Sequence, residues 1–423
     1  MTDTTRTDDH GSPSTAAAPS LDQFEAEART FLDANAERRP ADTFVWGQGS
    51  DHVGLFPERT PEQQAHDLAV SRDWAQRVFD AGFGWITGPT EYGGRGLPAD
   101  YQRAWARVAS EYATPSQAVY GIGLGMVAPT ILAHATDEVK EAYLRSLWRG
   151  DIVACQLFSE PSSGSDLASL QTRAVRDGDE WIINGQKVWT SGAQVSDIGE
   201  IICRTDPDLP KHRGLTGFVV DMHAPGVEVR PLRQMTGGAS FNEVFFTDVR
   251  VPDSHRLGDV NGGWTVALTT LMNERASIGG GGGGVGLPNS TRLIEVARAT
   301  GTNNDPLIRQ QLARIIINDR VAGYTNRRAM AKIAAGQLPG PEMSLAKLSL
   351  TANMVRTYEA LSSMLGPSLV VDTGAWGTYS WSYFLLGVPG MRIAGGSDEV
   401  LRNIIGERVL GLAKEPAPQG SSA

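Results

Sequence analysis

The sequence predicts an α+β fold in three parts: an N-terminal helical domain, a middle antiparallel β-barrel or sandwich, and a C-terminal four-helix bundle. Apolar residues recur at helical spacing towards both ends of the chain, and short alternating segments with turn dipeptides fill the middle. A length of 423 residues suits two or three cores. We place the domains at 21–150, 151–256 and 257–412, and we expect disordered tails at 1–20 and 413–423.

The N-terminal domain is predicted to be helical because helix-start signals precede amphipathic segments. Residues 21–34 carry apolar side chains at helical spacing, and a second helix begins after Thr60. Pro61 then takes the first turn and Gln63 the capping-box position, and Gly82 should end the helix. Three further helices complete the domain: 99–112, 117–135 and 137–148, the last closed by Gly150.

The middle domain is predicted from short β-rich segments separated by turn residues. Asp177-Gly178 and Asn184-Gly185 are typical of two-residue hairpin turns, so we expect two consecutive hairpins around them. The predicted strands are 152–158, 172–176, 181–184, 187–190, 198–205, 217–222, 227–232 and 242–249. A barrel or sandwich is the simplest way for such strands to bury one face.

Long amphipathic segments predict the C-terminal bundle. The first of them contains six consecutive glycines, 279–284, and the second begins with Asp305 as its cap. Trp381, Tyr383 and Phe384 are assigned to a loop between the third and fourth helices. The predicted helices are 263–299, 305–335, 342–364 and 397–412.

Composition and charge argue against several classes of function. The net charge is −10, from 48 acidic and 38 basic residues without a long basic run, which disfavours a nucleic-acid partner. No apolar run reaches the roughly 20 residues that span a bilayer, and the N-terminus lacks an apolar secretory segment. We therefore expect no membrane insertion and a cytoplasmic location. Cys155 and Cys203 lie in apolar strands, so we expect buried thiols and no metal site.

The strongest functional signal is a pair of segments at 155–166 and 184–193. The first reads C-Q-L-F-S-E-P-S-S-G-S-D, and its small residues let backbone N–H groups approach a flat polar ligand. The second reads N-G-Q-K-V-W-T-S-G-A, in which Trp189 offers an aromatic plate beside the hydroxyls of Thr190 and Ser191. An isoalloxazine ring needs both an apolar surface and hydrogen bonds to its polar edge, so the pair predicts a flavin site.

These two segments resemble the acyl-CoA dehydrogenase family, whose middle domain carries T/S-E-P-x-x-G-S-D followed by K-x-W-I/T-T/S. The C-terminal segment R-I-A-G-G-S-D-E-V also resembles the family. The resemblance implies that FAD is the cofactor and that Ser165 and Arg275 contact the substrate. It assigns FAD contacts to Gln156, Phe158, Ser159, Ser165, Trp189, Thr190, Ser191, Ser397 and Glu399.

The resemblance also identifies a candidate catalytic base. Members of the family use a glutamate either in the loop before the last helix or, as in isovaleryl- and long-chain-type members, in the first long C-terminal helix before an arginine. Here Gly395 stands at the loop position, whereas Glu274 precedes Arg275 in the helix. We therefore predict Glu274 as the base and Arg275 as its orienting neighbour; the alternative is a solvated ion pair on the helix surface. Asp398 is expected to cap the last helix, and Glu399 to contact the nucleotide part of FAD.

The activity that the resemblance implies is FAD-dependent α,β-dehydrogenation of an acyl-CoA to the 2-enoyl thioester. An electron-transfer flavoprotein would accept the electrons, and the chain would form a homodimer or homotetramer. An acyl-CoA oxidase or flavin monooxygenase on the same fold is one alternative. A non-catalytic flavin-binding partner subunit is another.

Two features depart from the family pattern. Its R-x-x-F-G segment, which touches FAD across a subunit boundary, is replaced here by A-R-A-T-G-T-N-N-D-P-L-I-R-Q-Q, and its Q-x-F-G-G segment by S-M-L-G-P-S. No FAD contacts are therefore assigned to these places. The glycines at 279–284 either pack closely against a neighbouring helix or leave room for a wide or branched acyl group, and we favour the second interpretation.

Overall fold

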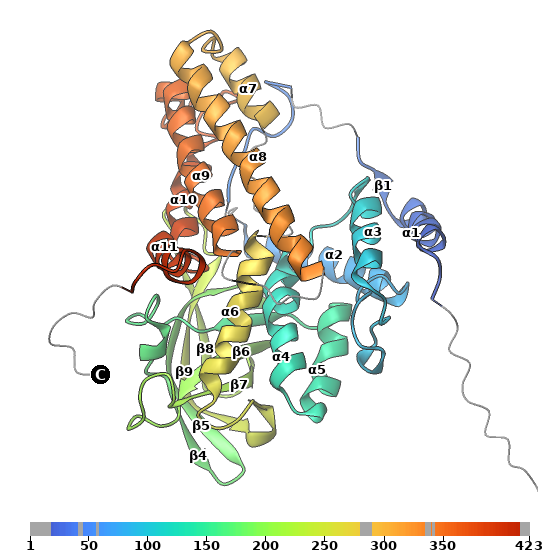
Figure 1. Ribbon diagram of the computed structural model, residues 1–423, viewed down its shortest axis with the longest axis vertical. Helices are drawn as coiled ribbons and strands as arrows, with labels where there is room; N and C mark the ends of the chain where they lie inside the picture. Colours follow the sequence, from blue (N-terminus) through green and yellow to red (C-terminus); the bar gives the residue numbers. More distant parts are fainter. Residues whose placement is uncertain are drawn as a thin grey trace, which may run out of the picture.

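The protein is described by a computed structural model, in which the sheet lies at the lower left of Figure 1, with the N-terminal helices beside it and the C-terminal helices above it. The fold class is confirmed, whereas the domain boundaries stay predictions. Most of both predicted tails and the glycines at 280–284 lie outside the described residues. The described residues are 18–40, 45–55, 59–279, 290–334, 340 and 343–414.

The N-terminal helices begin where the capping signals predict. Ser20 with Gln23 and Thr60 with Gln63 each form a complete capping box, and Gly150 ends the fifth helix with a left-handed backbone. The helices are α1 (Leu21–Asn35), α2 (Pro61–Asp80), α3 (Ala99–Ala109), α4 (Ala128–His134) and α5 (Asp137–Arg149).

The prediction of a single helix at 117–135 is wrong. The segment instead contains a short 3-10 turn at Ala118–Tyr120, a π-helical turn at Gly123–Val127, and then α4. Glycines weaken the helix here, and Pro129 in the first turn of α4 has no backbone N–H to donate. The widened turn lies against helix α6 (Gly263–Gly279).

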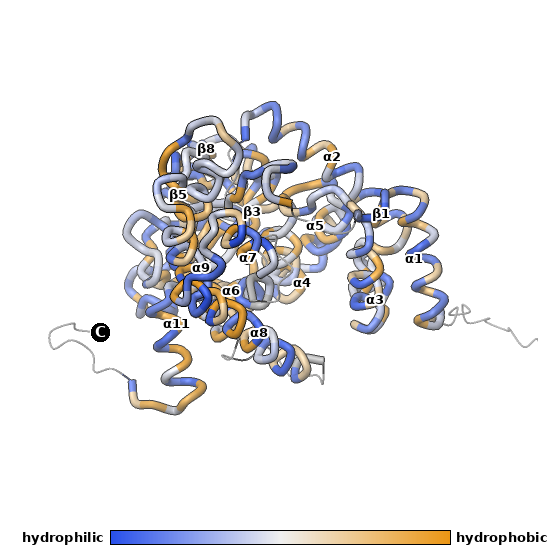
Figure 2. The backbone as a smooth tube through the Cα atoms, turned by 90° about the horizontal axis from the view of Figure 1, so that it is seen from above, coloured by the Kyte–Doolittle hydropathy of each residue, from blue (hydrophilic) through white to orange (hydrophobic). Residues whose placement is uncertain are grey.

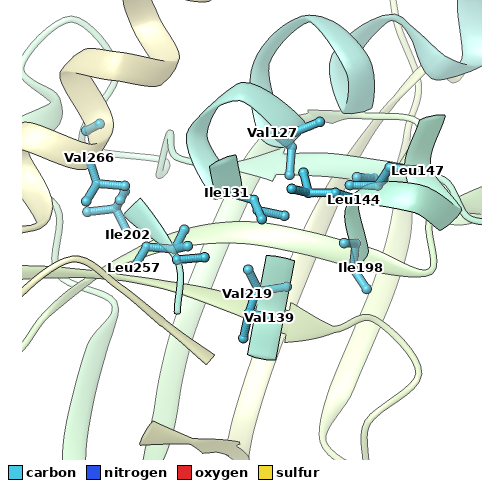
Figure 3. Close-up of a cluster of buried hydrophobic side chains, with 14 of the residues drawn as sticks. Val127, Ile131, Val139, Leu144, Leu147, Ile198, Ile202, Val219, Leu257 and Val266 are labelled. Atoms are coloured by element: carbon cyan, nitrogen blue, oxygen red, sulfur yellow. The ribbon is translucent and has the colours of Figure 1, made fainter. Parts of the chain in front are cut away.

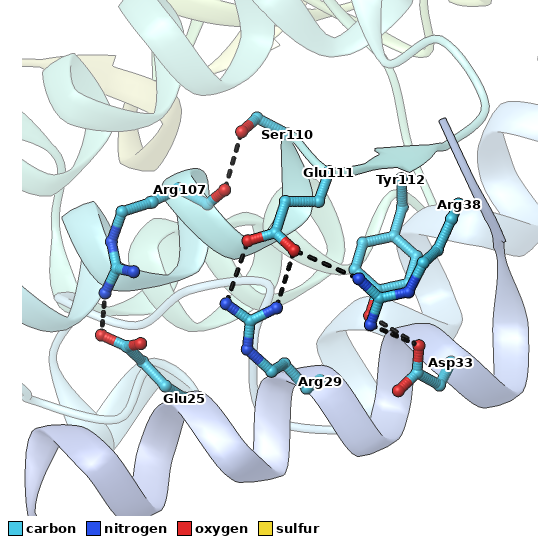
Figure 4. A network of polar contacts seen from close by, with 8 residues as sticks. All are labelled: Glu25, Arg29, Asp33, Arg38, Arg107, Ser110, Glu111 and Tyr112. Atoms are coloured by element: carbon cyan, nitrogen blue, oxygen red, sulfur yellow. Dashed lines mark hydrogen bonds and ion pairs between the residues drawn. The ribbon is translucent and has the colours of Figure 1, made fainter. Parts of the chain in front are cut away.

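Helices α1 and α3 stand to one side of the molecule in both views (Figures 1 and 2). Polar contacts join them: Arg29 of α1 donates two hydrogen bonds, of 2.7 and 2.9 Å, to the Glu111 carboxylate that follows α3 (Figure 4). Arg38 also contacts Glu111, and the Tyr112 hydroxyl donates to Asp33 at 2.7 Å. A two-stranded ladder, β1 (Glu37–Arg38) with β2 (Tyr112–Ala113), completes this junction.

The central sheet has the order β10-β7-β6-β4-β5-β9-β8, and β3 pairs with β6 in parallel. One further parallel pair joins β4 to β6, so the sheet is mixed and not wholly antiparallel. The strands are β3 (Ala154–Leu157), β4 (Arg173–Asp177), β5 (Glu180–Ser191), β6 (Ile198–Arg204), β7 (Leu215–Asp221), β8 (Val227–Leu232), β9 (Phe241–Pro252) and β10 (Arg256–Leu257).

Only one of the two expected hairpin turns is present. Asp177-Gly178 turns the chain between β4 and β5 as predicted. Asn184-Gly185 instead lies inside the continuous strand β5, where the register with β9 shifts between Ile183 and Gly185. The Asn-Gly pair thus serves a bulge, because Gly185 adopts a φ of 153° that residues with a Cβ avoid.

The C-terminal helices pack around α9, which contacts α6, α8, α10 and α11. The loop predicted around Trp381 and Phe384 is largely helix α10, whose buried residues sit among apolar side chains of α8 and α9. Tertiary packing thus outweighs the weak helix signal of a Gly- and Pro-containing segment. The helices are α6, α7 (Ser290–Ala299), α8 (Pro306–Ala334), α9 (Met343–Leu365), α10 (Ser382–Ile393) and α11 (Asp398–Ile404), and Asp305 caps α8 as expected.

One apolar cluster fixes α6 on the sheet. Val266 of α6 packs among Ile202 of β6, Val219 of β7 and Ile131 of α4, all of which are fully buried (Figure 3). Burial on this scale contributes about 1.5–3 kcal/mol per large side chain. The cluster therefore holds α6 in a fixed position between the sheet and α4. Among the described helices, none combines the length and apolar character needed to cross a bilayer.

The bulge in β5 gives a first prediction. Replacing Gly185 with Ala places a Cβ 2.7 Å from the Thr172 Cα at an unfavourable φ, so unfolding free energy should fall by about 3 kcal/mol. The control is Gly178→Ala, where φ is also positive but a Cβ meets nothing within 4 Å, so the loss should be about 1 kcal/mol. Urea unfolding measures both, and equal losses would contradict the assignment of a tight bulge.

Candidate active site

A buried ion pair joins the two segments that predicted the site. Lys187 of β5 lies 2.9 Å from the Glu160 carboxylate, and its ammonium also donates to the Phe158 carbonyl at 2.9 Å. Both side chains are almost inaccessible, at 0% and 5% exposed. The Glu160 carboxylate further accepts backbone N–H bonds from Gln171 and Thr172, at 2.6 and 2.8 Å. This network fixes the Ser-rich loop at 159–165 against the strand that carries Trp189.

The pKa values of this pair agree with a stable ion pair. Burial acts to raise the pKa of Glu160, but Lys187 and the N–H donors outweigh it and hold the pKa below its ordinary value. Burial lowers the pKa of Lys187, and Glu160 opposes that change. Both residues stand in the two motif segments, but no role was predicted for them. The sequence feature that could have indicated a buried ion pair is a lysine at an inward-facing position of a half-buried strand.

The backbone turns Trp189 away from the protein. Its φ is +62°, in the left-handed region that a bulky residue rarely adopts, and the ladder between β5 and β9 shifts register between Lys187 and Thr190. The indole is 58% exposed and meets Phe241 edge-on, with ring centroids 6.1 Å apart. A strained bulge that presents an aromatic plate is a common arrangement at ligand sites.

The residues around Trp189 fit a flat polar ring such as that of FAD. The hydroxyl oxygen of Thr190 is buried and has no hydrogen-bond partner among the described residues. Ser159 and Ser191 are half-buried, and Ser165 is exposed. A Cβ on Gly164 would meet nothing within 4 Å, so the loop leaves open space. An aromatic face, an unpartnered hydroxyl and open space are what a flavin ring requires.

Glu274 lies on α6 and meets the sheet through Gln156 of β3. The Gln156 side chain hydrogen-bonds its carboxylate, so Gln156 contacts the predicted base in addition to its predicted place beside FAD. The residue is half-buried, and burial raises the pKa of its carboxyl; Arg275, Gln156 and Lys347 oppose this rise only in part. The half-burial of Glu274 and Arg275 thus disfavours the solvated surface ion pair that we considered, and the role of Glu274 stays a prediction.

Arg275 is half-buried beside Glu274. Its Nε atom is buried and has no hydrogen-bond partner in the described part of the chain. Burial lowers the pKa of the guanidinium, Glu274 opposes this change, and Arg408 adds a repulsive charge. An unpartnered cationic donor close to a carboxylate can bind an acidic or carbonyl group of a ligand.

Lys347 of α9 binds the segment that precedes α11. Its ammonium donates to the Gly396 carbonyl at 2.8 Å and lies 3.5 Å from Asp398. Asp398, 2% exposed, also binds Arg392 and Thr351. The prediction that Asp398 caps α11 is therefore wrong, because a capping side chain must reach back to the helix N–H groups and this one points into the interior.

Ser397 caps α11 instead, accepting a hydrogen bond from the Val400 backbone N–H at 3.3 Å. The Glu399 side chain is 71% exposed and lies 3.7 Å from Arg402, so it is free of the buried network. Both residues stay predicted FAD contacts. Gly395 has a φ of 67° and lies in the loop that Lys347 supports.

A second carboxyl, for which no role was predicted, contacts α6 one turn before Glu274. Glu200 of β6 is fully buried, and its Oε1 atom lies 2.5 Å from the Thr270 hydroxyl of α6. Burial raises its pKa to about 8, and the Thr270 hydrogen bond opposes the rise. The sequence feature that could have indicated this buried carboxyl is an isolated glutamate in the otherwise apolar run I-G-E-I-I-C.

Comparisons with known proteins cover nearly the whole chain. Sequence models described as the N-terminal, middle and C-terminal domains of acyl-CoA dehydrogenase match residues 56–151, 155–249 and 261–410. The chain is 36% identical over 404 residues to acyl-CoA dehydrogenase IpdE1 of Mycobacterium tuberculosis, covering 93% of this chain and 98% of that protein. It is 39% identical to acyl-CoA dehydrogenase FadE34 of the same organism over 77% of this chain, but spans only 44% of FadE34.

Solved structures are also similar to this chain over nearly its whole length. The structure described as "Tcur3481-Tcur3483 steroid ACAD" has a TM-score of 0.70 at 28% identity, covering 94% of this chain and 99% of that one. The ChsE4-ChsE5 complex from Mycobacterium tuberculosis has a TM-score of 0.68 at 27% identity, with 95% and 100% covered.

The buried ion pair gives a second prediction. Lys187→Met leaves the Glu160 charge buried without its cation, which should lower unfolding free energy by about 3–5 kcal/mol and weaken FAD retention. Lys211→Met is the matched control, because Lys211 pairs with Asp166 of the same region at a largely exposed site and should lose less than about 1 kcal/mol. Adding Glu160→Gln to Lys187→Met should restore part of the loss. Denaturant unfolding and flavin absorbance measure these effects, and similar losses for both lysines would refute the role of the buried pair.

Proposed function

The chain belongs to the acyl-CoA dehydrogenase family, and we propose that it converts an acyl-CoA to the 2-enoyl thioester with Glu274 as the base. FAD is the cofactor of the family, and the chain is an oxidoreductase of that class. The observation that supports the proposal most is the position of Glu274: a carboxyl with a raised pKa, hydrogen-bonded by Gln156 at the junction of α6 and β3.

The proposed role of Glu274 is to take the α proton of the thioester. Its carboxylate oxygen forms the new O–H bond, and the electron pair of the broken C–H bond becomes the α,β double bond. FAD, when bound, supplies the acceptor for the hydride that leaves the β carbon. A carboxyl with a raised pKa is a stronger base than one in water, which helps it to remove a weakly acidic proton. Gln156 donates to the carboxylate and so fixes its direction.

The remaining site residues are proposed to bind and orient. Arg275, with its unpartnered Nε, would hold a polar group of the substrate, and Ser165 on the exposed loop would contact the substrate or FAD. Trp189 would cover one face of the FAD ring. The remaining proposed FAD contacts are Gln156, Phe158, Ser159, Thr190, Ser191, Ser397 and Glu399.

The substrate proposed for this chain is a bulky acyl-CoA. The name of the Tcur3481-Tcur3483 steroid ACAD supports a wide acyl group, as does our interpretation of the glycines at 279–284, which lie mostly outside the described residues. An electron-transfer flavoprotein as electron acceptor, a homodimer or homotetramer, a role in lipid metabolism and a cytoplasmic location stay predictions. The ChsE4-ChsE5 complex makes assembly with a different chain the alternative to a homo-oligomer.

Replacing Glu274 with Gln tests the proposed base. The variant keeps the shape of the side chain but cannot accept a proton, so flavin reduction by a thioester should slow by about 10³-fold while the bound FAD spectrum persists. Glu141→Gln, on the exposed face of α5, is the control for loss of a carboxylate elsewhere and should reduce flavin at the unaltered rate. Anaerobic stopped-flow absorbance measures both rates. Full activity of Glu274→Gln would remove the proposed mechanism.

A further inference from the structure

Four side chains form a contact between α6 and the sheet directly behind the proposed base. Gln156 of β3 lies opposite Glu200 of β6 in the parallel ladder, so their side chains leave the same face of the sheet. Helix α6 lies on that face: Glu274 meets Gln156, and the Thr270 hydroxyl, one turn earlier, lies 2.5 Å from Glu200 Oε1. Glu200 thus supports the helix turn that precedes Glu274.

The hydrogen bonds around Glu200 suit a protonated carboxyl. Only its Oε1 atom has a partner; Oε2 is buried and has none among the described residues. The Thr270 hydroxyl also lies 3.2 Å from the Val266 carbonyl and 2.9 Å from the Thr130 hydroxyl, which can donate to the Met126 carbonyl at 2.9 Å. If Glu200 donates to Thr270, then Thr270 can donate to Val266 and Thr130 to Met126, so each of the three protons has an acceptor.

An ionised Glu200 could still accept the Thr270 proton while Thr130 donates to Met126 or Thr270. Its charge, however, would be fully buried without a cation in contact, and its Oε2 would have no partner among the described residues. Burial is the cause that raises its pKa, and no charged side chain contributes. The titratable groups on the elements packed around it are Glu274 and Arg275 of α6, His134 of α4, Asp221 of β7, Arg173, Arg176 and Asp177 of β4, Arg204 of β6, and Cys155 and Cys203 on the other face of the sheet.

We propose that Glu200 is a positioning residue that must keep its proton for Glu274 to act as the base; this inference rests on the proposed function. In the protonated form it seats α6 on the sheet through Thr270 and leaves Glu274 as the group that ionises at this contact. Loss of the proton to solvent leaves a buried negative charge at this contact with no cation beside it. That charge destabilises the packing of α6 on the sheet, which positions Glu274. The enzyme therefore stops working at alkaline pH.

The test is the pH profile of anaerobic flavin reduction by a thioester between pH 6 and pH 10. For the wild-type holoenzyme the rate should rise as Glu274 ionises and then fall by roughly tenfold per pH unit above about pH 8, as Glu200 ionises. Glu200→Gln can donate to Thr270 but cannot ionise, so it should keep the acid limb and lose the alkaline fall. Thr270→Val removes the donor that favours ionised Glu200, so its alkaline fall should move to higher pH. If the role of Glu200 were only structural, Glu200→Gln would keep the alkaline fall of the wild-type pH profile.

Two results would overturn the proposal: an alkaline fall in Glu200→Gln equal to that of wild type, or no fall in wild type up to pH 10. A wild-type enzyme that no thioester reduces at any pH would instead contradict the proposed function. Infrared spectroscopy measures the protonation state of Glu200 without catalytic turnover. It therefore decides the question both when no thioester reduces the flavin and when Glu200→Gln fails to fold. In Glu274→Gln, a protonated-carboxyl band should persist at pH 7 and disappear near pH 8. Absence of that band at pH 7 would refute the protonated Glu200.

Discussion

The ion pair between Lys187 and Glu160 is the contact on which the site depends. It joins a loop and a strand that are more than twenty residues apart in the sequence, and it does so where water is excluded. A pair of this kind is stable only if its remaining hydrogen-bonding capacity is filled. Here two backbone N–H groups and the Phe158 carbonyl fill it. The Ser-rich loop and the bulge at Trp189 therefore keep one relative position, which a rigid flat ligand requires.

Elements with strong local signals were predicted well, and those decided by tertiary packing were not. The capping boxes at Ser20 and Thr60 fix their helices because the cap chemistry is local. Asn184-Gly185 has the same dipeptide signature as a hairpin turn, yet pairing with β9 on one side keeps the strand continuous. Helix α10 escaped prediction because its glycines and proline weaken the local signal, while burial against α9 stabilises it.

Only the candidate site residues that stand in recognisable sequence motifs could be predicted. Resemblance to the family's motifs led to the prediction of Trp189 and Glu274 as site residues, and the structure explains the exposed indole by a bulge and the raised pKa of Glu274 by burial. The contact of Gln156 with Glu274 could not be predicted, because it depends on where α6 crosses the sheet. Asp398 was assigned to the cap in place of Ser397 because both are good capping residues in sequence, and only the buried Lys347 draws the carboxylate inwards.

Four buried or half-buried carboxyls described above, Glu160, Asp398, Glu200 and Glu274, fall into two groups with different chemistry. Glu160 and Asp398 each have a cation within contact distance, and their pKa values lie below the ordinary value even though burial opposes this. Glu200 has no such cation and Glu274 has only partial compensation, and burial raises the pKa of both. Groups with lowered pKa values keep a fixed charge and hold loops in place, whereas groups with raised values can exchange protons near neutral pH. Glu200 and Glu274 both lie where α6 contacts the sheet, whereas Glu160 and Asp398 hold the Ser-rich loop and the segment before α11 in place.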